Sequence, residues 1–227
     1  MRHIVLVGFA ALLTAGVSVP AMAQTTYDTT GSYFGDITSF GEPDTSTYGQ
    51  VFTVGSDNVL NTFSLYLEGG SGPISFKGYL YAWDGSHATG SALYASGTLS
   101  FTGGLSEYDF STGGVTLATG QQYVAFLSTS GLQDGGQITT GMPFDGNFGS
   151  STIGGGMVWY NTGNDFSALT SNSWDNTGNA VGDAWFKASF DSAGGVPEPA
   201  SWAMMLGGFG MVGGALRSRR KAAVSFG

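Results

Sequence analysis

Residues 61–68 read Asn61-Thr62-Phe63-Ser64-Leu65-Tyr66-Leu67-Glu68, with apolar and polar side chains in alternation. Side chains of a β-strand point to opposite faces in turn, so this alternation predicts a strand with one buried face. The apolar face is Phe63, Leu65 and Leu67, and the other face is Thr62, Ser64 and Tyr66. Residues 74–83 repeat the pattern, with Phe76, Leu80 and Ala82 opposed to Lys77, Tyr79, Tyr81 and Trp83. Two such strands indicate a sheet that covers a core with one face.

Similar short strand patterns occur on both sides of this pair. We predict further strands at 50–54, 92–101, 107–111, 122–128, 157–160 and 184–190. Gly-rich clusters at 69–73, 84–86, 103–104 and 113–114 predict the turns between them. No amphipathic helix is available to connect parallel strands, so the fold class is all-β, an antiparallel β-sandwich of jelly-roll-like type.

Two stretches are harder to assign. Residues 27–48 are polar and fit an opening strand followed by a loop. Residues 131–156 are rich in Gly, and a structureless loop of that length is unusual inside a compact domain. We therefore expect at least one strand there.

The composition narrows the possible functions. Aromatic residues make up 14% of the 227 residues, which is too many for a disordered chain. The sequence has no Cys, which excludes disulfides, thiolate metal sites and a Cys nucleophile. Residues 24–195 hold 15 acidic residues and two Lys, a net charge of −13 (2 − 15). Such a body repels phosphate backbones, so we predict no nucleic-acid partner.

The first residues have the pattern of a secretory signal peptide. Arg2 gives a basic start, residues 4–19 are apolar, and Ala21 and Ala23 form a small-x-small cleavage site. We predict cleavage after Ala23 and therefore passage through the secretion machinery.

A second apolar stretch lies near the other end of the sequence. Residues 202–216 contain no charge, and a basic cluster follows them. The cluster is Arg217, Arg219, Arg220 and Lys221. Fifteen helical residues span about 22 Å, which is short for a hydrocarbon core of about 30 Å. We predict a short transmembrane helix, a marginal anchor whose basic end stays in the cytoplasm and whose body lies outside.

A Pro-Glu-Pro motif precedes this apolar stretch. Its residues are Pro197, Glu198 and Pro199, followed by Trp202 and Ala203. Two Pro flanking Glu favour an extended backbone that an enzyme can grip. The order of motif, apolar helix and Arg cluster resembles the PEP-CTERM sorting signal of Gram-negative bacteria in its Pro-Glu-Pro-x-x-Trp-Ala form. The resemblance implies recognition by a membrane-embedded exosortase, removal of the tail, and an association with exopolysaccharide or biofilm.

These features divide the chain into five parts. They are a signal peptide (1–23), a β-sandwich domain (24–192), a Gly linker (193–195), a sorting signal (196–221) and a tail (222–227). Within the domain, residues 50–130 resemble a β-sandwich module of envelope proteins. The segments that resemble it are 50–54, 79–85 and 120–127. That resemblance supports the fold and implies no activity.

Few residues in the predicted domain suit catalysis. His87 is its one His and lies in a predicted turn, so a Ser-His-Asp triad would have to use it. No Gly-x-Ser-x-Gly elbow is present. A glycoside hydrolase would need a pair of carboxylates, and the candidates are Glu42, Glu68 and Glu107. We expect solvated surface charges at these positions, no catalytic site and no bound cofactor.

Calcium is the most plausible ion, because it accepts oxygen ligands from loops. Candidate ligands are Asn164, Asp165, Asp175, Asn176, Asn179 and Asp183, with Asp28, Asp36 and Asp44 earlier in the chain. A solvated acidic face explains these residues equally well, and no EF-hand spacing occurs.

Aromatic side chains are the remaining signal. Trp83, Trp159, Tyr160, Trp174 and Trp185 lie in or beside predicted strands. Core packing is the favoured interpretation for each Trp. Tyr66, Tyr79 and Tyr81 lie on the polar faces of two strands, where they would form a surface strip for stacking on sugar rings.

The sequence thus predicts an exported, non-enzymatic protein of the cell surface or extracellular matrix. Its precursor would be held at the inner membrane until the tail is removed. The alternative is a carbohydrate-binding module that uses exposed aromatic residues, and a secreted hydrolase is a third possibility.

Overall fold

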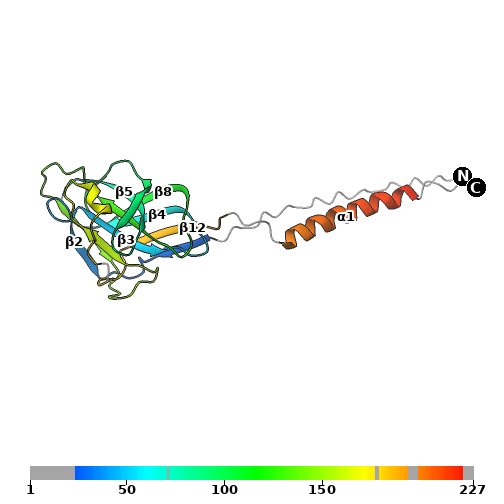
Figure 1. Ribbon diagram of the computed structural model, residues 1–227, viewed down its shortest axis with the longest axis horizontal. Helices are drawn as coiled ribbons and strands as arrows, with labels where there is room; N and C mark the ends of the chain where they lie inside the picture. Colours follow the sequence, from blue (N-terminus) through cyan, green and yellow to red (C-terminus); the bar gives the residue numbers. More distant parts are fainter. Residues whose placement is uncertain (1–23, 71, 177–178, 194–198, 222–227) are drawn as a thin grey trace, which may run out of the picture.

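The computed structural model describes residues 24–70, 72–176, 179–193 and 199–221. Their strands form a β-sandwich, and the long helix α1 (Pro199–Lys221) stands apart from it (Figure 1). Every strand pair is antiparallel. The predicted antiparallel β-sandwich is therefore confirmed. The signal peptide at 1–23 lies outside the described residues.

Two large sheets and one small sheet make up the sandwich. The four-stranded sheet has the order β1 (Gln24–Asp28), β12 (Phe186–Asp191), β4 (Val59–Leu67) and β8 (Ser106–Thr116). The six-stranded sheet has the order β11 (Met157–Tyr160), β3 (Thr47–Thr53), β9 (Gln122–Ser128), β5 (Ile74–Trp83) and β6 (Ala88–Ala95), and β7 (Leu99–Phe101) also pairs with β5. The small sheet pairs β2 (Gly35–Gly41) with β10 (Thr139–Phe144).

The main core lies between the two large sheets. Phe52 of β3 stacks on Phe186 of β12, with ring centroids 5.5 Å apart. Phe76 of β5 meets Tyr108 of β8 edge to face at 4.8 Å. These contacts join opposite sheets, and large aromatic rings dominate the energetics of such cores. The inward direction predicted for Phe63, Leu65 and Leu67 is correct, since all three are fully buried.

The six-stranded sheet is buried on its second face as well. A smaller cluster there includes Tyr81, Phe126 and Trp174. The segment after β11 covers it, with the short 3-10 helix η1 (Phe166–Thr170) and Trp174, whose Nε1 donates to the carbonyl of Leu169 at 2.9 Å. The alternation in β5 therefore separates two buried environments and not core from solvent.

Two strand predictions and one turn prediction need correction. The single strand predicted at 92–101 is two strands, β6 and β7, which pair with different parts of β5. The turn predicted at 113–114 lies inside β8, because Gly113 and Gly114 take positive φ angles of 75° and 87° opposite a register shift in β4. The strand predicted at 184–190 is β12, which begins two residues later.

The two ambiguous stretches contain regular structure. Residues 27–48 hold the end of β1, all of β2 and the start of β3. Residues 131–156 contain β10, so the expected strand is present there.

A buried carboxylate ties the loops after β10 to the six-stranded sheet. Asp183 is fully buried, and its Oδ1 accepts hydrogen bonds from Gln50 Nε2 and Ser151 Oγ, both at 2.7 Å. Its Oδ2 accepts from the Thr152 amide at 3.0 Å. Burial raises the pKa of Asp183, and these hydrogen bonds act in the opposite direction. Gln50 also accepts from the Ala184 amide at 2.7 Å, so the cluster closes on itself.

We expect Asp183→Ala to lower the free energy of unfolding by about 3 kcal/mol, because several buried donors lose their acceptor at once. Urea unfolding followed by tryptophan fluorescence measures the loss. The matched control is Asp175→Ala in the same region, where the side chain is exposed and the change should stay within about 0.5 kcal/mol. Equal effects of the two variants would contradict a structural role for the buried carboxylate.

Close packing of β3 against β9 leads to a second prediction. A Cβ at Gly49 would lie 2.6 Å from Cβ of Phe126 and 2.7 Å from the carbonyl oxygen of Ala125. Gly49→Ala should therefore cost about 1–3 kcal/mol, because backbone must move to admit it. Gly97→Ala, where nothing lies within 4 Å, should be neutral in the same thermal-unfolding measurement. If Gly49→Ala leaves the melting temperature unchanged, β3 and β9 are packed less closely than these distances indicate.

Candidate functional site

The predicted sorting signal lies partly within helix α1. Pro197 and Glu198 fall outside the described residues. Pro199 is the first residue of α1, a position that tolerates Pro because its missing N–H would have no partner in the helix. Trp202 and Ala203 follow in the first turns. The helix is longer than the predicted 202–216 and includes the basic cluster of Arg217, Arg219, Arg220 and Lys221.

The described side chains in the middle of α1 face solvent. Met204, Phe209 and Met211 are 81%, 71% and 75% exposed. Among the described residues, no helix combines the length and the apolarity that crossing a membrane requires. Five Gly between 202 and 216 lower the apolarity of this stretch. The transmembrane helix therefore stays a prediction, as do the cleavage residues Ala21 and Ala23, which lie outside the described residues.

Asp84, Ser86 and His87 come together in the turn after β5, but not as a triad. His87 Nδ1 lies 3.0 Å from Ser86 Oγ and 3.1 Å from Asp84 Oδ2. A catalytic His needs one ring nitrogen for the nucleophile and the other for the carboxylate. Here Ser86 and Asp84 both contact Nδ1 of His87, so the three side chains do not have the geometry of a catalytic triad. Asp84 instead accepts from the amides of Ser86 and His87, as turn residues do.

Two of the three carboxylates considered for hydrolysis are engaged in other contacts. Glu42 accepts from the Gly135 amide at 3.0 Å, and Glu107 pairs with Lys187 at 3.0 Å. Glu68 joins β10 through its backbone. The three glutamates therefore contact different parts of the fold.

The side chains considered for calcium mostly stabilise turns. Asp165 accepts from the Ser167 amide and caps η1, and Asn164 accepts from the amides of Gly131 and Gln133. Asp183 is fully buried in its own network. In the part of the chain that the structure describes, no group of three or more His, Cys, Asp or Glu could hold a metal ion.

The predicted tyrosine strip is wrong. Tyr66 and Tyr81 are each 7% exposed, and they belong to different sheets. Tyr79 packs on Phe126 and Phe166 in the covered face of the six-stranded sheet. Trp83 and Trp174 are buried in that cluster, as core packing predicts, whereas Trp159 and Tyr160 are partly buried.

An aromatic array does reach the surface, beside the four-stranded sheet. Trp185 stands edge to face between Tyr33 and Tyr66, with ring centroids 5.5 and 5.6 Å away. Its Nε1 donates to the carbonyl of Ser32 at 2.6 Å, which fixes the indole. Tyr33 is 54% exposed and donates its hydroxyl to Asp36 at 3.2 Å. We call these three residues the aromatic array. Tyr33 gave no strand signal, so sequence reasoning missed it.

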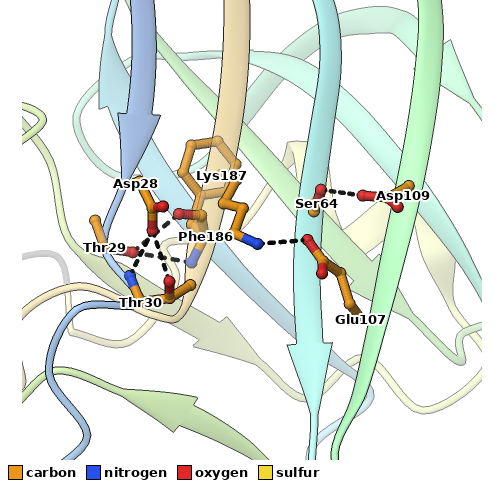
Figure 2. A network of polar contacts seen from close by, with 8 residues as sticks. All are labelled: Asp28, Thr29, Thr30, Ser64, Glu107, Asp109, Phe186 and Lys187. Atoms are coloured by element: carbon orange, nitrogen blue, oxygen red, sulfur yellow. Dashed lines mark hydrogen bonds and ion pairs between the residues drawn. The ribbon is translucent and has the colours of Figure 1, made fainter.

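A polar groove adjoins the array on the outer face of the same sheet. The hollow has a volume of about 360 Å³. Its polar lining consists of Thr26, Asp28, Thr62, Ser64, Glu107, Asp109, Lys187 and Ser189. We call it the outer groove. Figure 2 shows Lys187 of β12 pointing toward β4, where it meets the carboxylate of Glu107 from β8, while Ser64 of β4 binds Asp109 of β8.

Contacts with neighbouring side chains favour the ionised forms of Glu107 and Lys187 in this groove. Burial acts to raise the pKa of Glu107, but contacts with Tyr66 and Lys187 outweigh it and lower this pKa. The pKa of Lys187 is raised by the same kind of contact, first with Tyr66 and then with Glu107. Burial raises the pKa of Tyr66 to about 12, so its phenol stays neutral. Lys187 also lies 5.3 Å from the centre of the Tyr66 ring, which connects groove and array.

Asp28 closes the other side of the groove. Its Oδ1 accepts from the amide and the hydroxyl of Thr30, at 2.9 and 2.7 Å (Figure 2). Thr29 anchors the same turn, because its hydroxyl accepts from the Phe186 amide at 2.9 Å. The carboxylate is exposed beyond these contacts.

Comparison with solved structures found two chains of low similarity. One holds the cysteine protease and lectin-like domains of Cwp84, a surface layer associated protein of Clostridium difficile, with 11% identity and a TM-score of 0.46 over 78% of this chain. This chain spans 37% of the length of that one. The other is the CBM36-1 domain of a multidomain xylanase from the hindgut metagenome of Trinervitermes trinervoides, with 15% identity and a TM-score of 0.31 over 54% of this chain and 94% of that one.

Comparison with protein families concerns the segment after the sandwich. No curated protein matches the sequence significantly. Residues 195–221 match the family model of the PEP-CTERM protein-sorting motif. The match includes Pro197, Glu198 and Pro199, the apolar stretch and the basic cluster. The chain therefore carries a PEP-CTERM protein-sorting motif.

Proposed function

We propose that this chain is a non-enzymatic protein of the cell surface or extracellular matrix, in association with polysaccharide. The sorting motif at 195–221 is the observation on which the proposal depends, since such a motif implies export and processing by an exosortase-like enzyme. The signal-peptide pattern at 1–23 implies the same route. A Gram-negative cell envelope is the location that this motif suggests.

The contacts of the charged side chains in the sandwich support a role without catalysis. The turn that brings Asp84, Ser86 and His87 together uses one nitrogen of His87 for both partners. The ion pair of Glu107 and Lys187 holds two strands of the sheet in place. These groups stabilise the fold, and a stable scaffold is what a displayed domain needs.

A carbohydrate-binding role is the second candidate. It is favoured by the aromatic array, where Tyr33 is 54% exposed beside a polar groove. A secreted hydrolase has less support, because Glu42 and Glu107 are engaged in separate contacts.

Mass spectrometry of the protein recovered from exosortase-competent cells tests the sorting proposal. We expect a mature chain that ends near Pro199 and lies in the surface or extracellular fraction. Glu198→Ala should instead accumulate the chain extending to Gly227 in the membrane fraction, because the motif loses its central charge. Ser201→Ala, at a variable position of the motif, should be processed normally. A wild-type chain that keeps its tail to Gly227 in such cells would refute the proposal.

A further inference from the structure

The outer groove and the aromatic array form one continuous surface. Lys187 contacts Glu107 in the groove at 3.0 Å and the Tyr66 ring of the array at 5.3 Å. Tyr66 in turn meets Trp185, and Trp185 meets Tyr33. Lys187 and Ser189 are alternate residues of β12, so their side chains lie about 7 Å apart on the same face, and Trp185 lies one residue before this strand begins. The surface is therefore elongated, as a site for an extended chain must be.

The charge of this surface selects among ligands. Asp28, Glu107 and Asp109 line the groove with one cation, Lys187, which gives a net charge of −2 (1 − 3). Asp36 and Glu68 add negative charge beside Tyr33, where partial loss of hydration and these two carboxylates raise the pKa of the phenol. Residues 24–195 carry −13 in total. Complementary charge on a ligand is therefore positive, and polyanions are repelled.

The aromatic array narrows the class of possible ligands further. The exposed ring of Tyr33 offers a π face, and such faces attract cations and the C–H groups of sugar rings. The groove presents the exposed hydroxyl of Thr26 and those of Thr62 and Ser189, which bond to each other at 2.7 Å, and such hydroxyls can accept further hydrogen bonds from ligand hydroxyls. A ligand that satisfies all three features has rings, many hydroxyls and positive charge.

We propose that the outer groove and the aromatic array bind a polysaccharide that carries free amino groups. This inference rests on the proposed surface or matrix role and names the ligand class for it. The exposed carboxylate of Asp109 pairs with ligand ammonium groups, Tyr33 packs against a sugar ring, and the pair of Glu107 and Lys187 holds the sheet beneath the chain. Alternating contacts of this kind suit a polymer better than a single small ligand.

The test uses the exported protein purified in detergent after signal-peptide removal, with titration calorimetry against three soluble glycans. These are an oligomer of glucosamine with free amines, the fully N-acetylated form of the same oligomer, and an oligomer of a uronic acid. We expect the amine-bearing oligomer to bind, the N-acetylated one to bind at least about tenfold more weakly, and the acidic one not to bind. Similar affinity for the first two would overturn the proposal, because charge would then play no part.

Variants locate the site. Tyr33→Ala and Asp109→Asn should each weaken binding of the amine-bearing oligomer about fivefold to tenfold. Both side chains are exposed, so the variants should keep the wild-type melting temperature, which circular dichroism checks. Matched controls are Tyr160→Ala on β11 of the other sheet and Asp134→Asn in the loop before β10, and neither should change affinity.

Two further outcomes would also refute the inference. Equal weakening by all four variants would indicate general attraction of a polycation to an acidic body. If the amine-bearing oligomer does not bind, polysaccharides with free amino groups are excluded as the ligand class. Neither result affects the sorting proposal, since tail removal in cells is read from the mass of the chain and not from glycan binding.

Discussion

The fold depends on the packing of aromatic rings between two twisted sheets. Phe52 from the six-stranded sheet stacks on Phe186 and contacts Phe190 of the four-stranded sheet, with centroids 5.5 and 5.9 Å apart. Strands of only 3 to 11 residues, in a chain with 39 Gly, contribute little order on their own. Large rings compensate, because each buries much apolar area for few rotatable bonds. Close contact also explains why Gly is needed at 49, where a Cβ would strike the next strand.

That packing leaves the two sheets in different situations. The six-stranded sheet is covered on its second face by η1 and Trp174, so its outer aromatic residues form another core. Among the described residues, no segment covers the outer groove of the four-stranded sheet, and the polar lining of this groove consists of hydroxyls, carboxylates and one Lys. The outer face of the four-stranded sheet is therefore the surface that is open to a ligand. The interactions of Lys187 with Glu107 and Tyr66 brace this surface from strand to strand.

Much of the fold could be predicted from the sequence, because a period of two and Gly clusters mark strands and turns. The predicted direction of Phe63 and Leu65 was correct, since both are fully buried in the core, although Ser64 and Tyr66 on the opposite side of β4 are buried as well. The same reasoning failed for Tyr79 and Tyr81, because alternation cannot reveal that a distant segment covers the opposite face. Gly113 and Gly114 misled for a local reason, since positive φ serves a bulge as well as a turn.

The two functional regions differ in how far sequence can reveal them. The sorting motif is contiguous in the sequence, so residues 195–221 can be recognised directly. The aromatic array instead joins Tyr33, Tyr66 and Trp185, which are far apart in the chain and meet only when β12 pairs with β4. Its geometry is a product of the fold, and the ring of Trp185 is placed by a backbone carbonyl from another segment. The sorting motif can therefore be recognised without the tertiary structure. The aromatic array, in contrast, exists only while the sheets of the sandwich are folded together.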